Sequence, residues 1–105
     1  MILAEKLRKE SEEATAARAA DTAHARSEGT DRAEAFFLGT PPRRHWPRPD
    51  PALVARDAQL ILGVPKDAPA IAAYVDAFVT TFAACAQENE QAYADQVALR
   101  GRAPR

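Results

Sequence analysis

The residues best suited to chemistry lie in one short stretch, TPPRRHWPRPDP at residues 40–51, which we call the strap. Arginine side chains bind phosphates, and a tryptophan ring can stack on a nucleic-acid base. The strap places three arginines beside the only tryptophan of the chain, and a basic tail follows at residues 100–105. This pattern makes a nucleic-acid-associated regulator the alternative function. Its contact residues would be Arg43, Arg44, Arg48, Arg100, Arg102 and Arg105.

The strap also has a purely structural interpretation, because prolines stiffen a chain into an extended path. A tryptophan ring is large and apolar, so we expect Trp46 to be buried against the two helices that follow the strap. An anchored strap would present its arginines rigidly on the surface. We favour this stiff connector over a dedicated ligand motif. The strap residues that we expect to contact a protein partner are Arg43, Arg44, Trp46 and Arg48.

Metal-binding chemistry has few candidates in this sequence. The soft ligands are His24, His45 and Cys85, and none of their spacings matches a metal motif such as H-x3-H or C-x2-C. We therefore predict that the chain holds no metal and needs no cofactor.

Catalytic groups are equally sparse. Cys85 lies at a core position of a predicted helix, where a cysteine usually behaves as a small apolar residue. The acidic pairs Glu12–Glu13 and Glu88–Glu90 are spaced so that their carboxylates do not face each other on a helix. The four glycines are isolated, and they form no phosphate-binding loop. We predict that the chain is not an enzyme.

Charge and composition argue against a global attraction to nucleic acid or membrane. The 105 residues carry a formal net charge of -1. No apolar run approaches the roughly 20 residues of a membrane span, and no secretory signal pattern is visible. The single cysteine allows no disulfide within the chain, which fits a reducing compartment. We expect a cytoplasmic protein, and the abundant alanine, arginine and proline suggest a phage or bacterial accessory protein.

The elements that must position these residues are predicted to be four helices, giving an all-α fold without strands. A long Ala-rich helix should span about residues 3–27 and end at Gly29, a natural C-cap residue. Asp31 and Glu34 have the spacing of a capping box, so a short second helix should start there. The chain then divides into an N-terminal helix at 1–28, a helical core at 31–99 that includes the strap, and the basic tail.

The other two helices are predicted to form an antiparallel hairpin over about residues 51–62 and 67–99. Asp50 and Pro51 have the chemistry of an N-cap followed by the first helical residue, and Gly63 is suited to end that helix. Asp67 is the expected cap of the longer helix. The link between the two is only four residues, which favours antiparallel neighbours.

The longer helix carries a coiled-coil-like seam with alternating spacings of four and three residues. Its members are Ile71, Val75, Phe78, Phe82, Cys85, Asn89, Ala92, Gln96 and Leu99. The first half of the seam is strongly apolar, whereas the second half is small and polar. The helix at 51–62 is about 18 Å long, so it covers only the first half.

The uncovered second half leads to our main functional prediction. We expect it to form, with the helix at 1–28, the surface of a non-enzymatic protein–protein interaction module of the assembly, adaptor or inhibitor kind. The partner would be a foreign protein or a second copy, with a homodimer favoured, and Asn89 would set the register as buried polar residues do in coiled coils. The seam residues assigned to partner binding are Asn89, Ala92, Tyr93 and Leu99.

Overall fold

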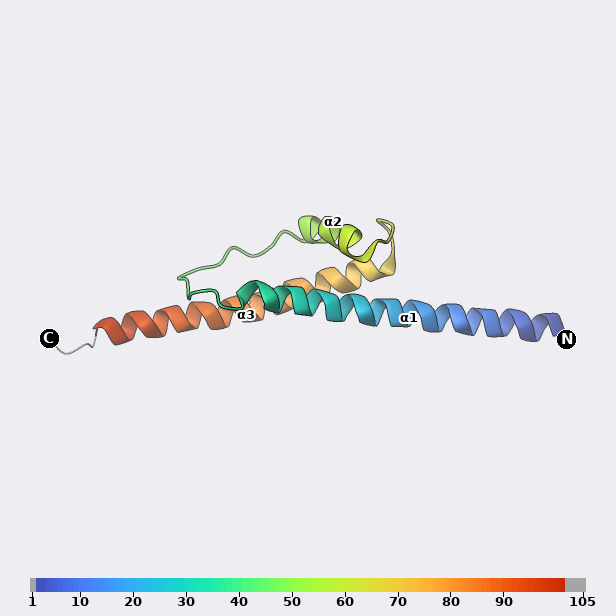
Figure 1. Ribbon diagram of the computed structural model, residues 1–105, viewed down its shortest axis with the longest axis horizontal. Helices are drawn as coiled ribbons and strands as arrows, with labels where there is room; N and C mark the ends of the chain where they lie inside the picture. The colour runs from blue at the N-terminus through green and yellow to red at the C-terminus, as the bar shows by residue number, and fades with distance from the viewer. Residues whose placement is uncertain (1, 102–105) are drawn as a thin grey trace.

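The computed structural model describes the backbone of residues 2–101 and, outside residues 2, 5, 7 and 11–20, their side chains. Over residues 2–101 it forms three α-helices and no strand (Figure 1). These are α1 (Ile2–Phe37), α2 (Pro51–Leu62) and α3 (Pro69–Gly101). The prediction of an all-α fold is therefore confirmed.

The two long helices, α1 and α3, lie side by side and run in the same direction (Figure 1). Arg26 of α1 pairs with Asp76 of α3 at 3.2 Å. Further along both helices, the rings of Phe37 and Phe82 have centroids 4.9 Å apart. Later residues of α1 thus meet later residues of α3, as parallel packing requires.

The parallel pair is also offset along its axis, which makes the molecule 86 Å long but only 21 and 16 Å across. The start of α3 lies beside Asp21 and Thr22, so residues 2–20 of α1 project beyond it (Figure 1). At the opposite end α1 stops at Phe37, whereas α3 continues to Gly101. We call residues 2–20 the α1 extension and residues 91–101, beyond the strap, the α3 extension.

The prediction of two separate helices before the strap is wrong, because α1 runs without a break through Gly29. A Cβ atom placed on Gly29 would lie 2.6 Å from the backbone oxygen of Tyr74 and 3.2 Å from the backbone nitrogen of Phe78. Glycine is therefore present because α1 and α3 approach closely there, and not because a helix ends. The expected capping box at Asp31 and the domain boundary near residue 29 both fall inside this one helix.

The limits of α2 agree with the sequence prediction. The Asp50 side chain accepts a hydrogen bond from the backbone nitrogen of Ala52 at 2.9 Å, and Pro51 is the first helical residue. At the other end Gly63 adopts the left-handed conformation with φ of 64° and donates its backbone N–H to Gln59. These are local effects, which the sequence displays directly.

The limits of α3 differ slightly from the prediction. The helix begins at Pro69 rather than at Asp67, because the backbone of Ala68 first closes a turn onto Pro65 at 3.0 Å. Proline suits the first helical position since its missing N–H would have no partner there. The helix includes Gly101, which was expected to lie beyond its end.

The first core cluster lies where α1 and α2 contact the beginning of α3. Most of its buried side chains are alanines, which let the helix backbones approach closely. Val54 of α2 and Ile71 and Tyr74 of α3 supply the larger apolar surface. The buried members are Ala25, Val54, Ala58, Ala70, Ile71, Ala73 and Tyr74.

The mean hydropathy of α3 is higher than the search for a long apolar run suggested. An 18-residue window of this helix has a mean hydropathy of 1.4, so by length and composition it could cross a membrane. The core helix of a globular protein passes the same test. The many alanines raise the mean hydropathy of α3 without forming a run of large apolar residues.

Candidate functional site

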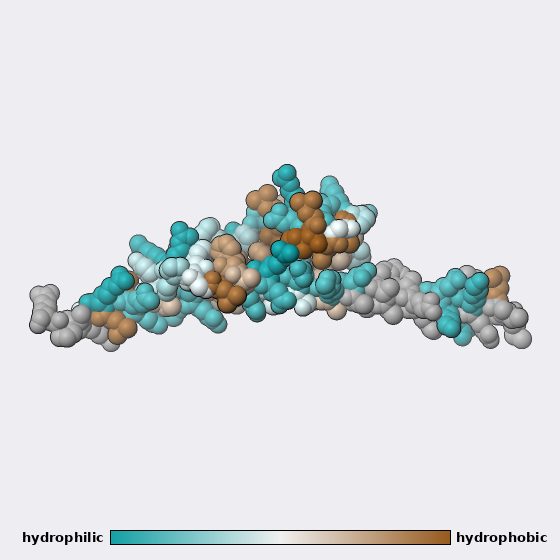
Figure 2. Space-filling view, in the orientation of Figure 1, coloured by the Kyte–Doolittle hydropathy of each residue, from teal (hydrophilic) through white to brown (hydrophobic). Residues whose placement is uncertain are grey.

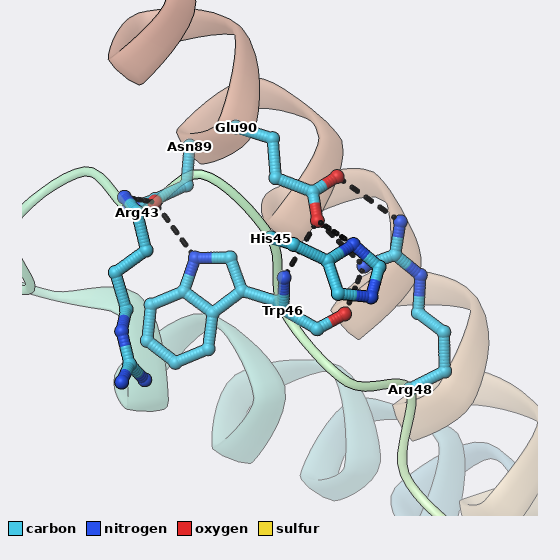
Figure 3. A network of polar contacts seen from close by, with 6 residues as sticks. All are labelled: Arg43, His45, Trp46, Arg48, Asn89 and Glu90. Atoms are coloured by element: carbon cyan, nitrogen blue, oxygen red, sulfur yellow. Dashed lines mark hydrogen bonds and ion pairs between the residues drawn. The ribbon is translucent and has the colours of Figure 1, made fainter.

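The strap crosses the α1–α3 pair, and Trp46 anchors it there (Figure 3). The Trp46 side chain is only 5% exposed, which confirms that it is buried. The centroid of its ring lies 5.1 Å from the ring centroid of Phe37. Trp46 belongs to a second core cluster with Phe82 and Ala86. The expected contact with α2 is wrong, because the strap crosses α1 and α3 before it reaches α2.

Asn89 of α3 fixes both the indole and the backbone of the strap. Its side-chain oxygen Oδ1 accepts a hydrogen bond from Trp46 Nε1 at 2.7 Å and another from the backbone nitrogen of Arg43 at 2.8 Å (Figure 3). A buried indole N–H needs such an acceptor. The amide that was expected to set the register between two chains is therefore engaged within one chain.

Glu90, the next residue of α3, accepts hydrogen bonds from two residues of the strap. Its Oε2 accepts from the backbone nitrogen of Trp46 at 2.7 Å, and its two oxygens accept from Arg48 at 3.2 and 3.3 Å. His45 Nδ1 lies 3.3 Å from the same carboxylate (Figure 3). The hydrogen bond from Arg48 and then that from the Trp46 backbone lower the pKa of Glu90.

Glu90 was missed at the sequence level, where it was considered only as one of two glutamates whose carboxylates do not face each other on a helix. Its side chain is in fact 20% exposed and lies under the strap. The available signal was a basic, proline-rich strap in a chain whose longest apolar helix carries Asn89 and Glu90 side by side. The sequence pattern alone does not predict that Glu90, rather than another carboxylate, pairs with Arg48.

The strap arginines differ in how strongly the chain itself engages them. The Arg43 guanidinium carbon lies 4.6 Å from the centroid of the Trp46 ring, in a cation–π contact. Arg48 is paired with Glu90 at 3.2 Å, whereas Arg44 is exposed. Because Trp46 is buried, its ring is not presented to a nucleic-acid base.

The remaining predicted binding residues lie further along α3 or in the tail, beyond the segment of α3 that the strap contacts. Ala92 and Tyr93 are half-buried, and Leu99 is 66% exposed. Arg100 is exposed, while Arg102 and Arg105 lie outside the described residues. The structure therefore divides the predicted residues into a strap junction, where the strap meets Asn89 and Glu90, and the α3 extension.

Cys85 is half-buried rather than fully buried, and burial followed by the charges of Glu88 and Glu34 raises the pKa of its thiol. A raised pKa keeps the thiol protonated near neutral pH, which disfavours a nucleophilic role. Within the part of the chain that is described, no three His, Cys, Asp or Glu side chains are grouped to hold a metal ion.

A shallow groove of about 590 Å³ lies between the start of α2 and the first turns of α3. Its apolar wall includes Ile71, Val75 and Val79, and its acidic groups are Asp67 and Asp76. The Asp76 carboxylate is already paired with Arg26 from α1. Its remaining charged group is Lys66, and the charges and apolar wall of the groove do not by themselves define a reaction.

No protein-family model, curated protein or solved structure matches this chain. Its function must therefore be inferred from its own surfaces. Two regions stand out for this purpose, the strap junction and the pair of helix extensions.

Proposed function

We propose that this protein is a non-enzymatic protein–protein interaction module that binds through its helix surfaces. The observation that carries the proposal is the offset of α1 and α3, which projects an extension from each end of the molecule (Figure 1). In the described part of the chain, no second helix lies along either extension. Most of the stability of a helix in a protein comes from packing of its apolar face, so a partner would stabilise both extensions.

Exposed apolar side chains near the two ends support the proposal. Leu3 is 69% exposed, and Val97 and Leu99 are 46% and 66% exposed. Apolar side chains are visible as brown patches close to both ends of the molecule in Figure 2. A partner that covered these positions would remove apolar surface from water, which favours association.

The strap has a supporting role in this proposal. We infer that the antiparallel hairpin of α2 and the first part of α3, tied to the Ala-rich α1 by the proline-rich strap, is the rigid base of the molecule. From this base the extensions project, and Arg43 and Arg44 add an exposed basic surface that would favour an acidic partner. The nucleic-acid alternative is weaker, because Trp46 is buried and Arg48 is neutralised by Glu90.

Site-specific photo-cross-linking in the producing cells tests this function. A photoreactive residue at Leu99 or Leu3 is expected to form covalent adducts with protein. The matched control is Arg56, which is exposed on α2, the helix beside the middle of the molecule (Figure 1). If neither extension position yields a protein adduct above the control, the interaction function is wrong. Salt-sensitive binding of the purified protein to nonspecific DNA would favour the alternative instead.

A further inference from the structure

We propose that the partner of the two extensions is a second copy of this chain, reversed by a two-fold axis perpendicular to the long axis of the molecule. In this arrangement the α1 extension of each copy runs antiparallel along the α3 extension of the other. The inference rests on the proposed interaction function and names the partner of the same surface.

The parallel, offset packing of α1 and α3 makes this arrangement self-consistent. The two extensions project from opposite ends of one molecule (Figure 1). A two-fold rotation exchanges the ends, so each α1 extension is brought beside the α3 extension of the other copy. One symmetry operation therefore covers all four extensions and closes the assembly at two copies. A head-to-tail arrangement would leave an extension uncovered at each end and would continue into a filament.

The lengths of the paired segments are compatible. The α1 extension has 19 residues, which corresponds to about 28 Å of helix. On the other side, the α3 extension has 11 residues, for about 16 Å of helix, so the α1 extension is long enough to cover all of it. The free end of each α1 can thus reach the free end of the other copy's α3.

The outermost side chains on the two segments match in the antiparallel order. Leu3 at the end of α1 meets Leu99 near the end of α3, and both are largely exposed in the single chain. One helical turn further in, Lys6 meets Asp95, and both are exposed. Among the described residues, the Asp95 carboxylate accepts a hydrogen bond from Gln91 on its own helix and is paired with no cation, so its charge is available to one.

The facing surface of α3 is suited to a close helix neighbour. A shallow hollow of about 400 Å³ runs along one side of α3. It is lined by Gln87, Glu88, Gln91, Ala92 and Asp95. Glu88, Ala92, Asp95 and Leu99 follow spacings of four, three and four residues, so the hollow shares one face with Leu99. The α1 extension is rich in alanine, which permits close approach of its backbone.

The first test is the mass of the full chain by light scattering across a concentration series. The expected result is a species of twice 11.4 kDa whose mass stops increasing at two copies. A monomer at high micromolar concentration overturns the proposal. A mass that continues to grow with concentration also overturns it, because that is the behaviour of a head-to-tail assembly.

Disulfide trapping tests the antiparallel register. In a Cys85→Ala background, chains carrying Leu3→Cys and chains carrying Leu99→Cys are mixed and oxidised. Each variant alone should stay unlinked, because identical positions lie at opposite ends, whereas the mixture should form a covalent dimer. Leu3→Cys mixed with Gln87→Cys is the control for parallel, head-to-tail pairing. Preferential linkage in that control overturns the proposed register.

Charge reversal gives a second, independent readout. Lys6→Glu alone and Asp95→Lys alone should each weaken self-association by roughly tenfold, because two like-charge pairs form per dimer. A mixture of the two variants should prefer mixed dimers, in which both pairs are again opposite in charge. Equal amounts of mixed and unmixed dimers would overturn the assigned pairing.

The photo-cross-linking experiment separates this inference from the proposed function. Adducts at Leu99 that contain only foreign protein overturn the second copy as partner and leave the interaction function intact. Adducts that contain a second copy of the chain support both. Absence of any protein adduct from either extension overturns both.

Discussion

The strap junction and the helix extensions differ in whether the rest of the chain covers the helix surface. At the junction, Asn89 and Glu90 bind the strap through several hydrogen bonds, and Trp46 fills the space between α1 and α3. At the extensions, α1 and α3 continue as helices beyond the segment where they lie side by side, and Leu3 and Leu99 are exposed. We infer that the junction stabilises the single chain, and our proposal assigns association to the extensions.

Removing the anchor of the junction should have the largest effect on stability. Trp46→Ala is expected to reduce the free energy of unfolding by about 3–5 kcal/mol, because a buried aromatic ring is lost and a cavity remains. Urea denaturation followed by circular dichroism measures the change. Trp46→Phe keeps a ring but loses the donor to Asn89, so it should be intermediate. Arg44→Ala is the exposed control, and an equal loss in that variant would contradict this assignment.

Gly29→Ala tests whether glycine is required at this position because α1 and α3 pack closely there. Helix propensity alone would make alanine more stable by about 1 kcal/mol. The new Cβ would instead lie 2.6 Å from the Tyr74 oxygen, so we expect a net loss of about 1–3 kcal/mol in unfolding free energy. Gly101→Ala is the matched control, because nothing lies within 4 Å of its Cβ position. Stabilisation by Gly29→Ala would contradict the close contact.

Acidification should weaken the junction through Glu90. The pKa of Glu90 is lowered in the folded chain, so its contribution to stability is complete above the ordinary glutamate value of about 4.3. That contribution is lost as the pH falls through the lowered folded pKa, where the carboxylate becomes protonated. The stability difference between the native chain and Glu90→Gln should therefore shrink between pH 6 and pH 3. A difference that grows on acidification would contradict the sign of this shift.

Deleting residues 1–20 should have the smallest effect on the core and a selective effect on association. The truncation removes the α1 extension but keeps Ala25 and Gly29, which lie in the packed part of α1. The thermal unfolding midpoint should change little, whereas dimerisation measured by light scattering should be lost. Undiminished dimerisation of the truncated chain would show that the α1 extension is not part of the interface.

The sequence alone was sufficient wherever structure depends on neighbouring residues. Asp50, Pro51 and Gly63 determine both ends of α2, because capping and left-handed glycine conformations are local properties. The size and apolar character of Trp46 were enough to predict its burial. The all-helical fold followed from composition and periodicity in the same way.

Only the tertiary structure shows which distant residues contact each other, and local sequence patterns do not predict those contacts. A glycine at a helix end and a glycine at a close helix crossing look alike in sequence, so only packing against Tyr74 shows that Gly29 continues α1. Likewise, Asn89 and Glu90 become strap anchors only because residues more than 40 positions away fold onto them. The parallel offset of α1 and α3, from which the proposed association follows, is a long-range packing choice. It depends on how Phe37, Trp46 and Phe82 fit together, and no single segment encodes it.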